Sequence, residues 1–199
     1  MTTKDNLTVS RALPWVLTIG GAIGLLAAFV LTVEKIELIL DPTYVPSCSI
    51  NPILSCGSVM DTPQAVLFGF PNSLLGVAGF AIVLTIGVVL LTGATLPRWI
   101  YWGLQLGATA GIVFVHWLIF QSLYRIGALC PYCMVVWVVM IPIFWYVTLH
   151  NVTTARLTGA LRDGVIGIAR MHGVILALWY IVIIAMIGVE FWDYWRTLL

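Results

Sequence analysis

The chain has 199 residues, of which 61% are hydrophobic and only 9% are charged, and its mean hydropathy is +1.07. A soluble domain is roughly half apolar and about a quarter charged, so this composition excludes a soluble protein and indicates an integral membrane protein. The formal net charge is +1, with neither a basic stripe nor an acidic tail, which argues against a nucleic acid as partner.

The first predicted helix covers residues 12–33, an uncharged stretch between Arg11 and Glu34. A helix needs roughly 20 apolar residues to cross a hydrocarbon core of about 30 Å, and this stretch supplies them. It is longer than the apolar part of a signal peptide, and VEKIEL follows it where a cleavage site would need small residues. We therefore expect a retained transmembrane helix.

A long polar connection, residues 34–70, follows this helix and holds Cys48 and Cys56. Within it, the segment 57–68 is short and apolar and precedes the sequence GFP, which breaks it from the next helix. This pattern predicts a half-helix that lies along the membrane surface with Cys56 at its start.

Four more transmembrane helices are predicted, over residues 71–92, 99–124, 130–149 and 171–192. In the third helix of the chain, Gly103, Gly107 and Gly111 share a face, and this small-residue ladder predicts tight packing within the bundle. His116 lies in the middle of the same helix, where a polar group is costly unless paired. We expect a neutral histidine bonded to a neighbouring helix. Pro142 predicts a kink in the fourth helix.

The basic residues assign an orientation to these helices. With the N-terminus in the cytoplasm, six Lys and Arg residues lie inside and three lie outside. The inner set is Lys4, Arg11, Arg98, Arg156, Arg162 and Arg170, and the outer set is Lys35, Arg125 and Arg196. We therefore predict a multi-pass protein of the cell inner (plasma) membrane. All four cysteines then lie on the outer side, in an oxidising compartment where disulfides persist.

The sequence CPYC, residues 130–133, opens the fourth helix. Pro131 suits the first helical position because it lacks an N–H and has a fixed φ, which makes Cys130 a candidate N-cap. Unpaired N–H groups and the helix dipole stabilise a thiolate there, so Cys130 is expected to have the lower pKa of the pair. Cys133 lies one turn further along, closer to lipid depth.

Three chemistries are open to these cysteines. Each pair could form a static structural disulfide, although closing so short a loop as CxxC stabilises little. The two pairs could bind zinc, although closed zinc sites are usually built on knuckles and not on the end of a transmembrane helix. Thiol–disulfide exchange fits best, because it needs an accessible pair of low pKa near a second pair that passes electrons onward.

Together these residues resemble the vitamin K epoxide reductase family, in its bacterial branch, over about residues 10–150. The resemblance is carried by the seven residues between Cys48 and Cys56, a Thr six positions later, PNSLLG from Pro71, and the late CxxC. Quinone-linked oxidases of the DsbB type carry their CxxC in the first outer loop instead. The resemblance implies an all-α integral membrane fold: a four-helix bundle around a quinone, with a fifth helix added. We expect a single membrane domain, residues 1–199, without a fused thioredoxin-like domain.

The resemblance also implies roles for individual residues. Asn72 falls where the family has a quinone-contacting asparagine, with a helix-capping Asn as the alternative. Thr62 could cap the same short segment or orient the Cys133 sulfur or the quinone. Trp137 stands where the vertebrate enzymes have a quinone-contacting tyrosine, and its indole N–H can donate a hydrogen bond but lacks the acidity of a phenol. Met60 is a candidate pocket wall, or simply core.

The implied reaction is an electron relay. Electrons pass from Cys48 and Cys56 to Cys130 and Cys133 and then to a quinone, either menaquinone or ubiquinone. We expect Cys48 to be the more reachable loop cysteine and to be attacked first. The expected partners are membrane lipid and a separate thioredoxin-fold protein of the DsbA type, with no metal. Two alternatives stay open: a reductase of a quinone epoxide such as that of vitamin K, and a non-catalytic scaffold with static disulfides.

Overall fold

The computed structural model describes residues 3–155, 164 and 167–197. Within them the chain forms α1 (Thr3–Leu40), α2 (Cys56–Met60), the 3₁₀ helix η1 (Pro63–Val66), α3 (Ser73–Leu91), α4 (Arg98–Gln121), the π-helical turn η2 (Ser122–Ile126), α5 (Pro131–Thr154), α7 (His172–Glu190) and α8 (Trp192–Trp195). These ranges contain no β-strand, so the predicted all-α fold is confirmed. Arg156 and Arg162, which contribute to the predicted charge asymmetry, lie outside the described residues.

Among the described residues, five helical segments are long and apolar enough to cross a membrane: Arg11–Leu40, Ser73–Leu91, Arg98–Ile126, Pro131–Thr154 and His172–Glu190. The chain is therefore a multi-pass membrane protein. The largest difference from the predicted ranges is at α1, which continues to Leu40 where the prediction ends at residue 33. The charges at Glu34 and Lys35 mark the end of the apolar stretch and not of the helix, because a helix carries its own hydrogen bonds into water.

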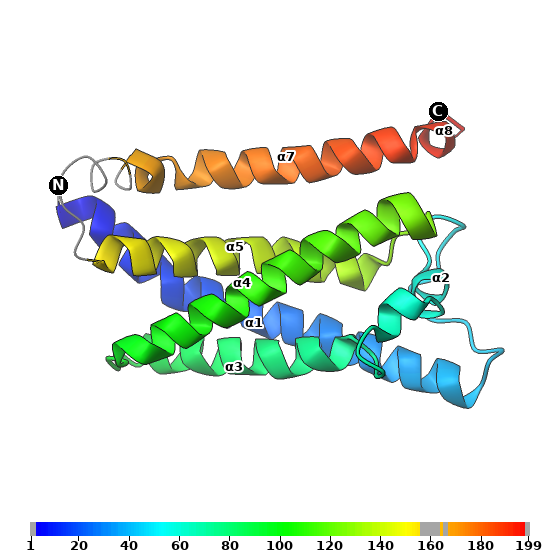
Figure 1. Cartoon of the computed structure of the whole chain (residues 1–199), viewed down its shortest axis with the longest axis horizontal. Helices are drawn as coiled ribbons and strands as arrows, with labels where there is room; N and C mark the ends of the chain where they lie inside the picture. Colours follow the sequence, from blue (N-terminus) through cyan, green and yellow to red (C-terminus); the bar gives the residue numbers. More distant parts are fainter. Residues whose placement is uncertain (1–2, 156–163, 165–166, 198–199) are drawn as a thin grey trace.

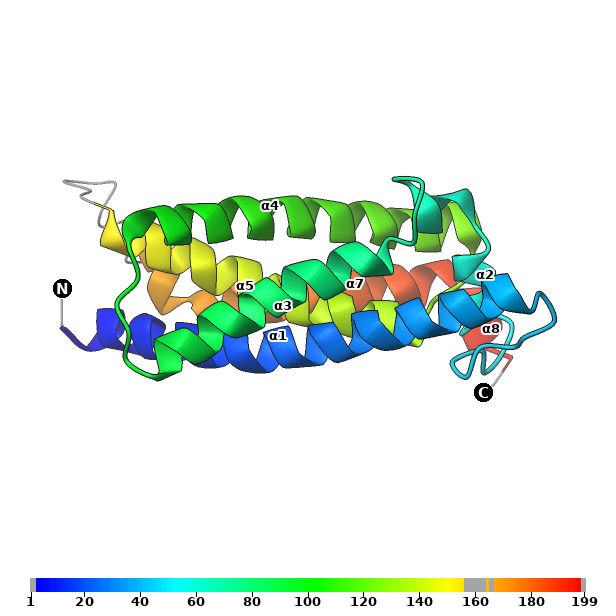
Figure 2. The same ribbon diagram turned by 90° about the horizontal axis from the view of Figure 1, so that it is seen from below.

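The long helices run roughly side by side, with α1 packed against both α3 and α5, and α4 packed against α5 (Figure 1). α7 lies alongside α5 on the outside of this group. Three parts of the chain gather at one end of the molecule: the loop that follows α1, the helix α2 and the helix α8. This end lies opposite the end where α1 begins (Figure 2). The short segments near the loop cysteines therefore form a cap at one end of an apolar bundle.

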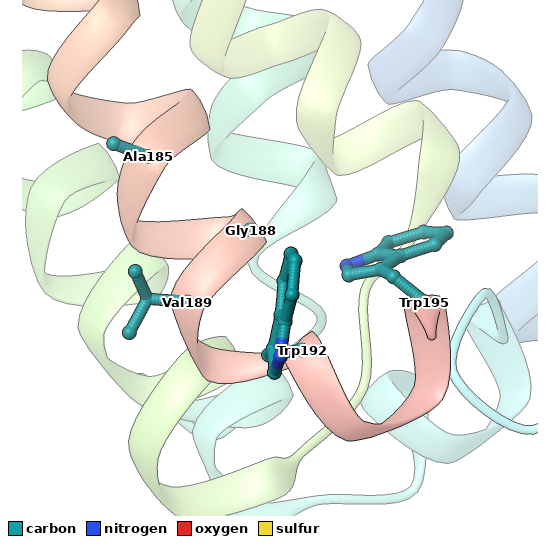
Figure 3. A pocket seen from close by; sticks show the side chains of 5 residues that line it. All are labelled: Ala185, Gly188, Val189, Trp192 and Trp195. Carbon is teal, nitrogen blue, oxygen red and sulfur yellow. The ribbon is translucent and has the colours of Figure 1, made fainter. Parts of the chain in front are cut away.

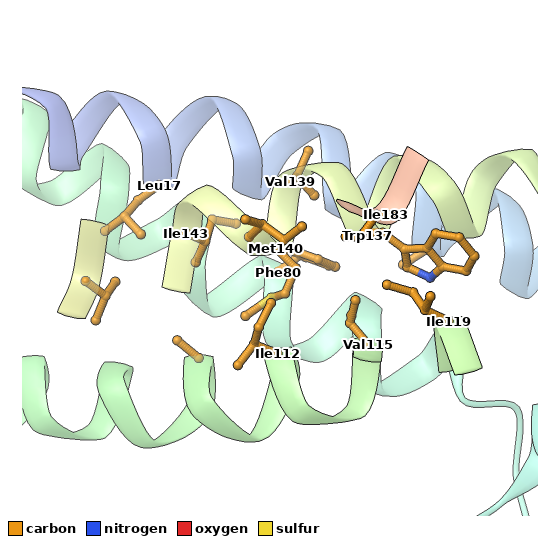
Figure 4. Packing of buried hydrophobic residues seen from close by; sticks show 14 of the residues in the cluster. Leu17, Phe80, Ile112, Val115, Ile119, Trp137, Val139, Met140, Ile143 and Ile183 are labelled. Atoms are coloured by element: carbon orange, nitrogen blue, oxygen red, sulfur yellow. The ribbon is translucent and has the colours of Figure 1, made fainter. Parts of the chain in front are cut away.

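The core of the bundle consists of apolar side chains from α1, α3, α4 and α5 (Figure 4). Leu17 and Ile143 have no exposed surface, and Ile119 is 2% exposed. Trp137 of α5 is 3% exposed and lies beside Ile119 of α4.

Two glycines allow α1 and α3 to approach each other closely. A Cβ added at Gly21 would lie 2.7 Å from the backbone nitrogen of Leu84, and one added at Gly87 would lie 2.6 Å from that of Thr18. Both obstacles are backbone atoms of the opposite helix, which a side-chain rotation cannot move. The contact between α1 and α3 thus requires glycine at both positions.

The predicted glycine ladder of α4 is wrong at two of its three positions. A Cβ at Gly103 or Gly107 would have no atom of the described residues within 4 Å. At Gly111 it would lie 2.8 Å from the terminal methyl of Met140. The shared face of these glycines turns away from the other described helices along most of its length, which sequence spacing alone does not reveal.

His116 joins α4 to α7, as expected for a paired histidine within the membrane. Trp179 Nε1 donates to His116 Nε2 at 2.9 Å, and His116 Nδ1 lies 2.8 Å from the Ile112 carbonyl oxygen. An indole N–H can only donate and a carbonyl can only accept, so the neutral tautomer with hydrogen on Nδ1 satisfies both. The prediction that this histidine is bonded to a neighbouring helix is confirmed.

A second bond joins α7 to α5 at Pro142. α5 runs through this proline without ending, and the missing N–H leaves the Val138 carbonyl without its helical donor. The hydroxyl of Tyr180 donates to that carbonyl oxygen at 2.6 Å. In lipid, an unsatisfied carbonyl is costly, so this bond gives α7 a fixed register on α5.

A shallow apolar pocket lies where α7 meets α8 (Figure 3). Its lining residues are Ala185, Gly188, Val189, Trp192 and Trp195. None of them belongs to the predicted site. Two tryptophans at a helix end are typical of the membrane interface, so we interpret this pocket as a surface that lipid covers.

The glycine contacts give a paired test of the packing. We expect Gly21→Ala to lower the thermal unfolding midpoint of the purified protein, because forcing a methyl group against backbone costs about 1–3 kcal/mol. Gly107→Ala, which adds the same atom in open space, should leave the midpoint unchanged or slightly raised. Equal midpoints for the two variants would contradict the described α1–α3 contact.

Candidate thiol–disulfide site

A short backbone bridge joins the loop between α1 and α2 to the start of α5. η2 ends at Gly127, whose φ of 68° turns the chain in a way that favours glycine. Two backbone hydrogen bonds of 2.7 and 2.9 Å then join Leu129 to the chain on either side of Leu54, forming an isolated parallel β-bridge. Cys56 comes two residues after Leu54, and Cys130 comes directly after Leu129. The bridge therefore brings these two cysteines together.

The sulfur atoms form one cluster. Cys48 and Cys56 are joined in a disulfide, whereas Cys130 and Cys133 are free thiols. Cys56 Sγ lies 3.1 Å from Cys130 Sγ, across a sequence separation of 74 residues. The loop pair and the CxxC pair are thus in contact, which is the geometry that exchange between two pairs requires.

The same cluster bears on the zinc alternative. The sulfur atoms of Cys48, Cys56 and Cys130 all lie within 4.8 Å of one another. Zinc binds cysteine as thiolate, and two of these three atoms are bonded to each other here. The described arrangement favours disulfide chemistry over metal binding.

Cys130 occupies the N-cap position of α5, with Pro131 in the first turn, as the sequence predicted. Its sulfur accepts from the backbone N–H of Cys133 at 3.4 Å. A hydrogen bond from the Cys133 side chain lowers the pKa of Cys130 below its usual value, backbone N–H groups of Cys133 and Tyr132 act in the same direction, and burial opposes them. Cys130 is therefore the cysteine of this pair that is prepared to be a thiolate.

The loop disulfide is buried. Cys48 is 5% exposed and Cys56 is fully buried, in an apolar cluster with Leu31, Met60 and Cys130. Cys48 is thus the more exposed of the two, in the direction expected, but the loop folds back onto the bundle and leaves little of either residue accessible. Met60 forms part of the core beneath the sulfur atoms.

Two charged residues near the C-terminal end of α1 anchor the loop, and sequence reasoning did not single them out. Glu34 accepts hydrogen bonds from Tyr44 and Ser47. Lys35 donates to the Met60 carbonyl oxygen at 2.8 Å and lies 3.7 Å from an Asp61 carboxylate oxygen. Their signal in the sequence is a pair of opposite charges directly after the apolar stretch.

Thr62 and Asn72 support the segment between α2 and α3. Thr62 Oγ1 donates to the Val59 carbonyl oxygen at 2.7 Å and makes no cap bond to η1. Asn72 Nδ2 donates to the Gln64 carbonyl oxygen at 2.6 Å, and Asn72 Oδ1 accepts from Leu67 N at 3.2 Å. Asn72 occupies the N-cap position of α3, as the capping alternative expected, but its side chain makes no cap bond to that helix.

Trp137 presents an unusual polar atom. Its Nε1 is buried and has no hydrogen-bond partner among the described residues. Trp137 follows Cys133 by four residues on α5, so the two share a helix face one turn apart. Burying a donor without an acceptor is costly, so this N–H is suited to an acceptor that enters the bundle below the cysteines.

An apolar helical bundle with two cysteine pairs in contact at one end defines a class: membrane proteins with a thiol–disulfide site. The chain belongs to the vitamin K epoxide reductase family, whose model matches residues 15–148. This family comprises quinone-linked thiol oxidoreductases of membranes. A search of curated proteins gave no match, so the assignment rests on the family model and the site.

The pKa of Cys130 can be measured in a variant that lacks the loop pair, Cys48→Ser with Cys56→Ser. Thiolate absorbance in the ultraviolet should rise with pH at a midpoint below about 8.5, the value of a free cysteine. Adding Cys133→Ala should raise the midpoint, because it removes the largest stabilising contact of the thiolate. A midpoint at or above the free value, or one that persists in Cys130→Ser, would contradict the assignment.

Proposed function

We propose that this protein re-oxidises a separate thioredoxin-fold protein of the DsbA type and passes the electrons to a membrane quinone, supporting disulfide formation in exported proteins. The observation that carries the proposal is the 3.1 Å between the sulfur atoms of Cys56 and Cys130. A scaffold with static disulfides has no need to hold a disulfide against a free thiol. A relay requires that contact.

The relay begins at the Cys48–Cys56 disulfide. A thiolate of the reduced partner attacks Cys48 Sγ, a bond forms between partner and Cys48, and Cys56 leaves as a thiolate. With Cys130 and Cys133 joined in a disulfide, that thiolate attacks Cys130 Sγ, and Cys133 leaves.

The second thiolate of the partner then attacks the partner's own bonded sulfur, so the partner departs oxidised and Cys48 is released. The Cys48 thiolate attacks Cys56 and displaces Cys130. The loop disulfide is restored, and two electrons remain on Cys130 and Cys133. This product has the same bonds as the described structure: Cys48–Cys56 oxidised and the CxxC pair reduced.

A bound quinone supplies an acceptor for two electrons and two protons. Cys130 and Cys133 release these as their disulfide forms again. Trp137 would donate its unpartnered N–H to a quinone oxygen. The amide group of Asn72 is hydrogen-bonded to the backbone of Gln64 and Leu67. Asn72 would therefore hold the outer segment over the site, or donate its remaining N–H hydrogen to the quinone. Thr62 and Met60 would form the wall between this site and the loop.

The direction of electron flow follows from potentials. A DsbA-type oxidant has a potential near about −120 mV, and for this two-electron couple about 30 mV corresponds to a tenfold change in the equilibrium constant. Thiol pairs of ordinary potential cannot keep such a partner oxidised. A quinone that respiration continually re-oxidises can, whether it is menaquinone or ubiquinone.

The proposed location is the inner (plasma) membrane, with the N-terminus in the cytoplasm and the cysteine cluster outside. The bias of Lys and Arg supports this orientation, and so does the need of the relay for an oxidising compartment. Labelling of Cys130 from the cytoplasmic side alone would refute the proposal.

Replacing one cysteine tests the reaction. We expect the purified protein with added quinone to oxidise a dithiol peptide, and Cys133→Ala to abolish this oxidation, because the CxxC disulfide can no longer form. A static scaffold would show no dependence on Cys133. Reduction of a quinone epoxide, assayed in parallel, separates the alternative reductase activity. If the unaltered protein shows no quinone-dependent oxidation of the peptide, the proposal is refuted.

The indole N–H of Trp137 has a matched control in the same helix. Trp137→Phe should raise the KM for quinone about fivefold, because one hydrogen bond contributes about 1 kcal/mol. Trp145 also has a buried Nε1 without a described partner, but it packs near Leu149 and Ala169 at the other end of α5. Trp145→Phe should leave that KM unchanged. Equal effects of the two variants would remove Trp137 from the proposed site.

A further inference from the structure

Glu34 is a buried carboxylate at the outer end of α1, with only 6% of its surface exposed. It accepts from the Tyr44 hydroxyl at 3.0 Å, from the Ser47 hydroxyl at 2.5 Å and from the Ser47 backbone N–H at 3.2 Å. A buried charge is tolerated when donors surround it, and all three of these donors come from the loop segment that leads to Cys48. Glu34 therefore ties this segment to the bundle.

The tie acts directly on the loop disulfide. Ser47 is bonded through the backbone to Cys48, so the two hydrogen bonds to Ser47 fix the residue next to the sulfur. Leu31, one turn before Glu34 on α1, packs in the same cluster as Cys48. The polar tie and the apolar contact hold Cys48 at 5% exposure.

Cys56 is held by different contacts. Lys35 donates to the Met60 carbonyl oxygen at the end of α2, the helix that starts at Cys56. The bridge between Leu54 and Leu129 fixes the other side of Cys56. On the other side of Cys48, Ser49 Oγ accepts from the Gly57 backbone N–H at 3.3 Å, so that side is joined to the Cys56 arm. Releasing Glu34 would therefore loosen the segment from Tyr44 to Cys48, while Cys56 stays beside Cys130.

We propose that Glu34 is a positioning residue that latches Cys48 in its buried place, and that opening of this latch admits the thiolate of the partner. The inference rests on the proposed function, in which an external thiolate must reach Cys48 Sγ. Because the whole residue Cys48 is only 5% exposed, such an attack requires that residues 44–48 lift away from the bundle. In this proposal the Cys48 arm controls the access of the partner thiolate to the disulfide, and the Cys56 arm passes electrons to Cys130.

The first test measures access to the disulfide without quinone or partner. In protein carrying Cys130→Ala and Cys133→Ala, the rate at which dithiothreitol reduces the Cys48–Cys56 disulfide is followed by maleimide labelling. Glu34→Ala should speed reduction by about 10-fold or more, since hydrogen bonds to a charged group shift an opening equilibrium by at least that factor. Tyr44→Phe, which removes one donor, and Glu34→Gln, which keeps an acceptor oxygen, should give smaller increases.

Glu37 provides the matched control. It lies on the same helix, three residues after Glu34, and is exposed. Glu37→Ala removes the same charge and should leave the reduction rate within about twofold, as surface substitutions usually have small effects. Equal rates for the Glu34 and Glu37 variants would overturn the latch.

A second readout separates a latch from general loosening of the loop. In protein carrying Cys48→Ala and Cys133→Ala, an added oxidant joins Cys56 to Cys130. Glu34→Ala should leave the yield of this disulfide unchanged, whereas Lys35→Ala should lower it. Loss of the yield in Glu34→Ala would show that Glu34 merely holds the whole loop, and would overturn the proposal. Both readouts are independent of quinone and partner, so their failure differs from failure of the proposed function.

Discussion

The site depends on the contact that holds residues 53–55 against Leu129. Ordering each residue of the loop costs about 1–2 kcal/mol, whereas each of the two backbone hydrogen bonds of the bridge contributes about 1 kcal/mol. The bridge alone cannot hold the loop. Most of the stabilisation must come from the apolar cluster beneath it, in which Cys48, Cys56 and Cys130 are themselves the buried side chains. The redox groups are thus part of the core that keeps them together, and docking of the loop is coupled to their covalent state.

The membrane explains why the remaining contacts take two forms. Lipid tails are as apolar as leucine, so burial of apolar surface does little to drive helices together. α1 and α3 instead gain close van der Waals contact at Gly21 and Gly87, and α7 gains two hydrogen bonds from the neighbouring residues Trp179 and Tyr180. The bond of Trp179 goes to α4 and that of Tyr180 goes to α5, so α7 is fixed against both of these helices.

Sequence reasoning succeeded where local chemistry decides the outcome. Charge-free apolar stretches of sufficient length predicted the five long helices, and Pro131 predicted the N-cap at Cys130. It failed where neighbours decide. The spacing of Gly103 and Gly107 says that they share a face but not which way it turns, and a charge such as Glu34 looks like an ordinary helix end until its donors are in place. The contact of Leu54 with Leu129 has no local signal, since backbone groups of any residue can form it.

Cys130 gives the cluster its chemical asymmetry. Its sulfur touches Cys56 on one side, and on the other it accepts hydrogen bonds from Cys133, which lower its pKa. In thiol–disulfide exchange, a thiol of lower pKa is the better leaving group and the weaker nucleophile. In the proposed relay, Cys130 leaves when Cys48 displaces it from Cys56, so the lowered pKa favours this step and disfavours its reverse. The contacts of one sulfur atom would then favour the step that passes electrons from the loop pair to the CxxC pair, while the quinone supplies the net driving force of the relay.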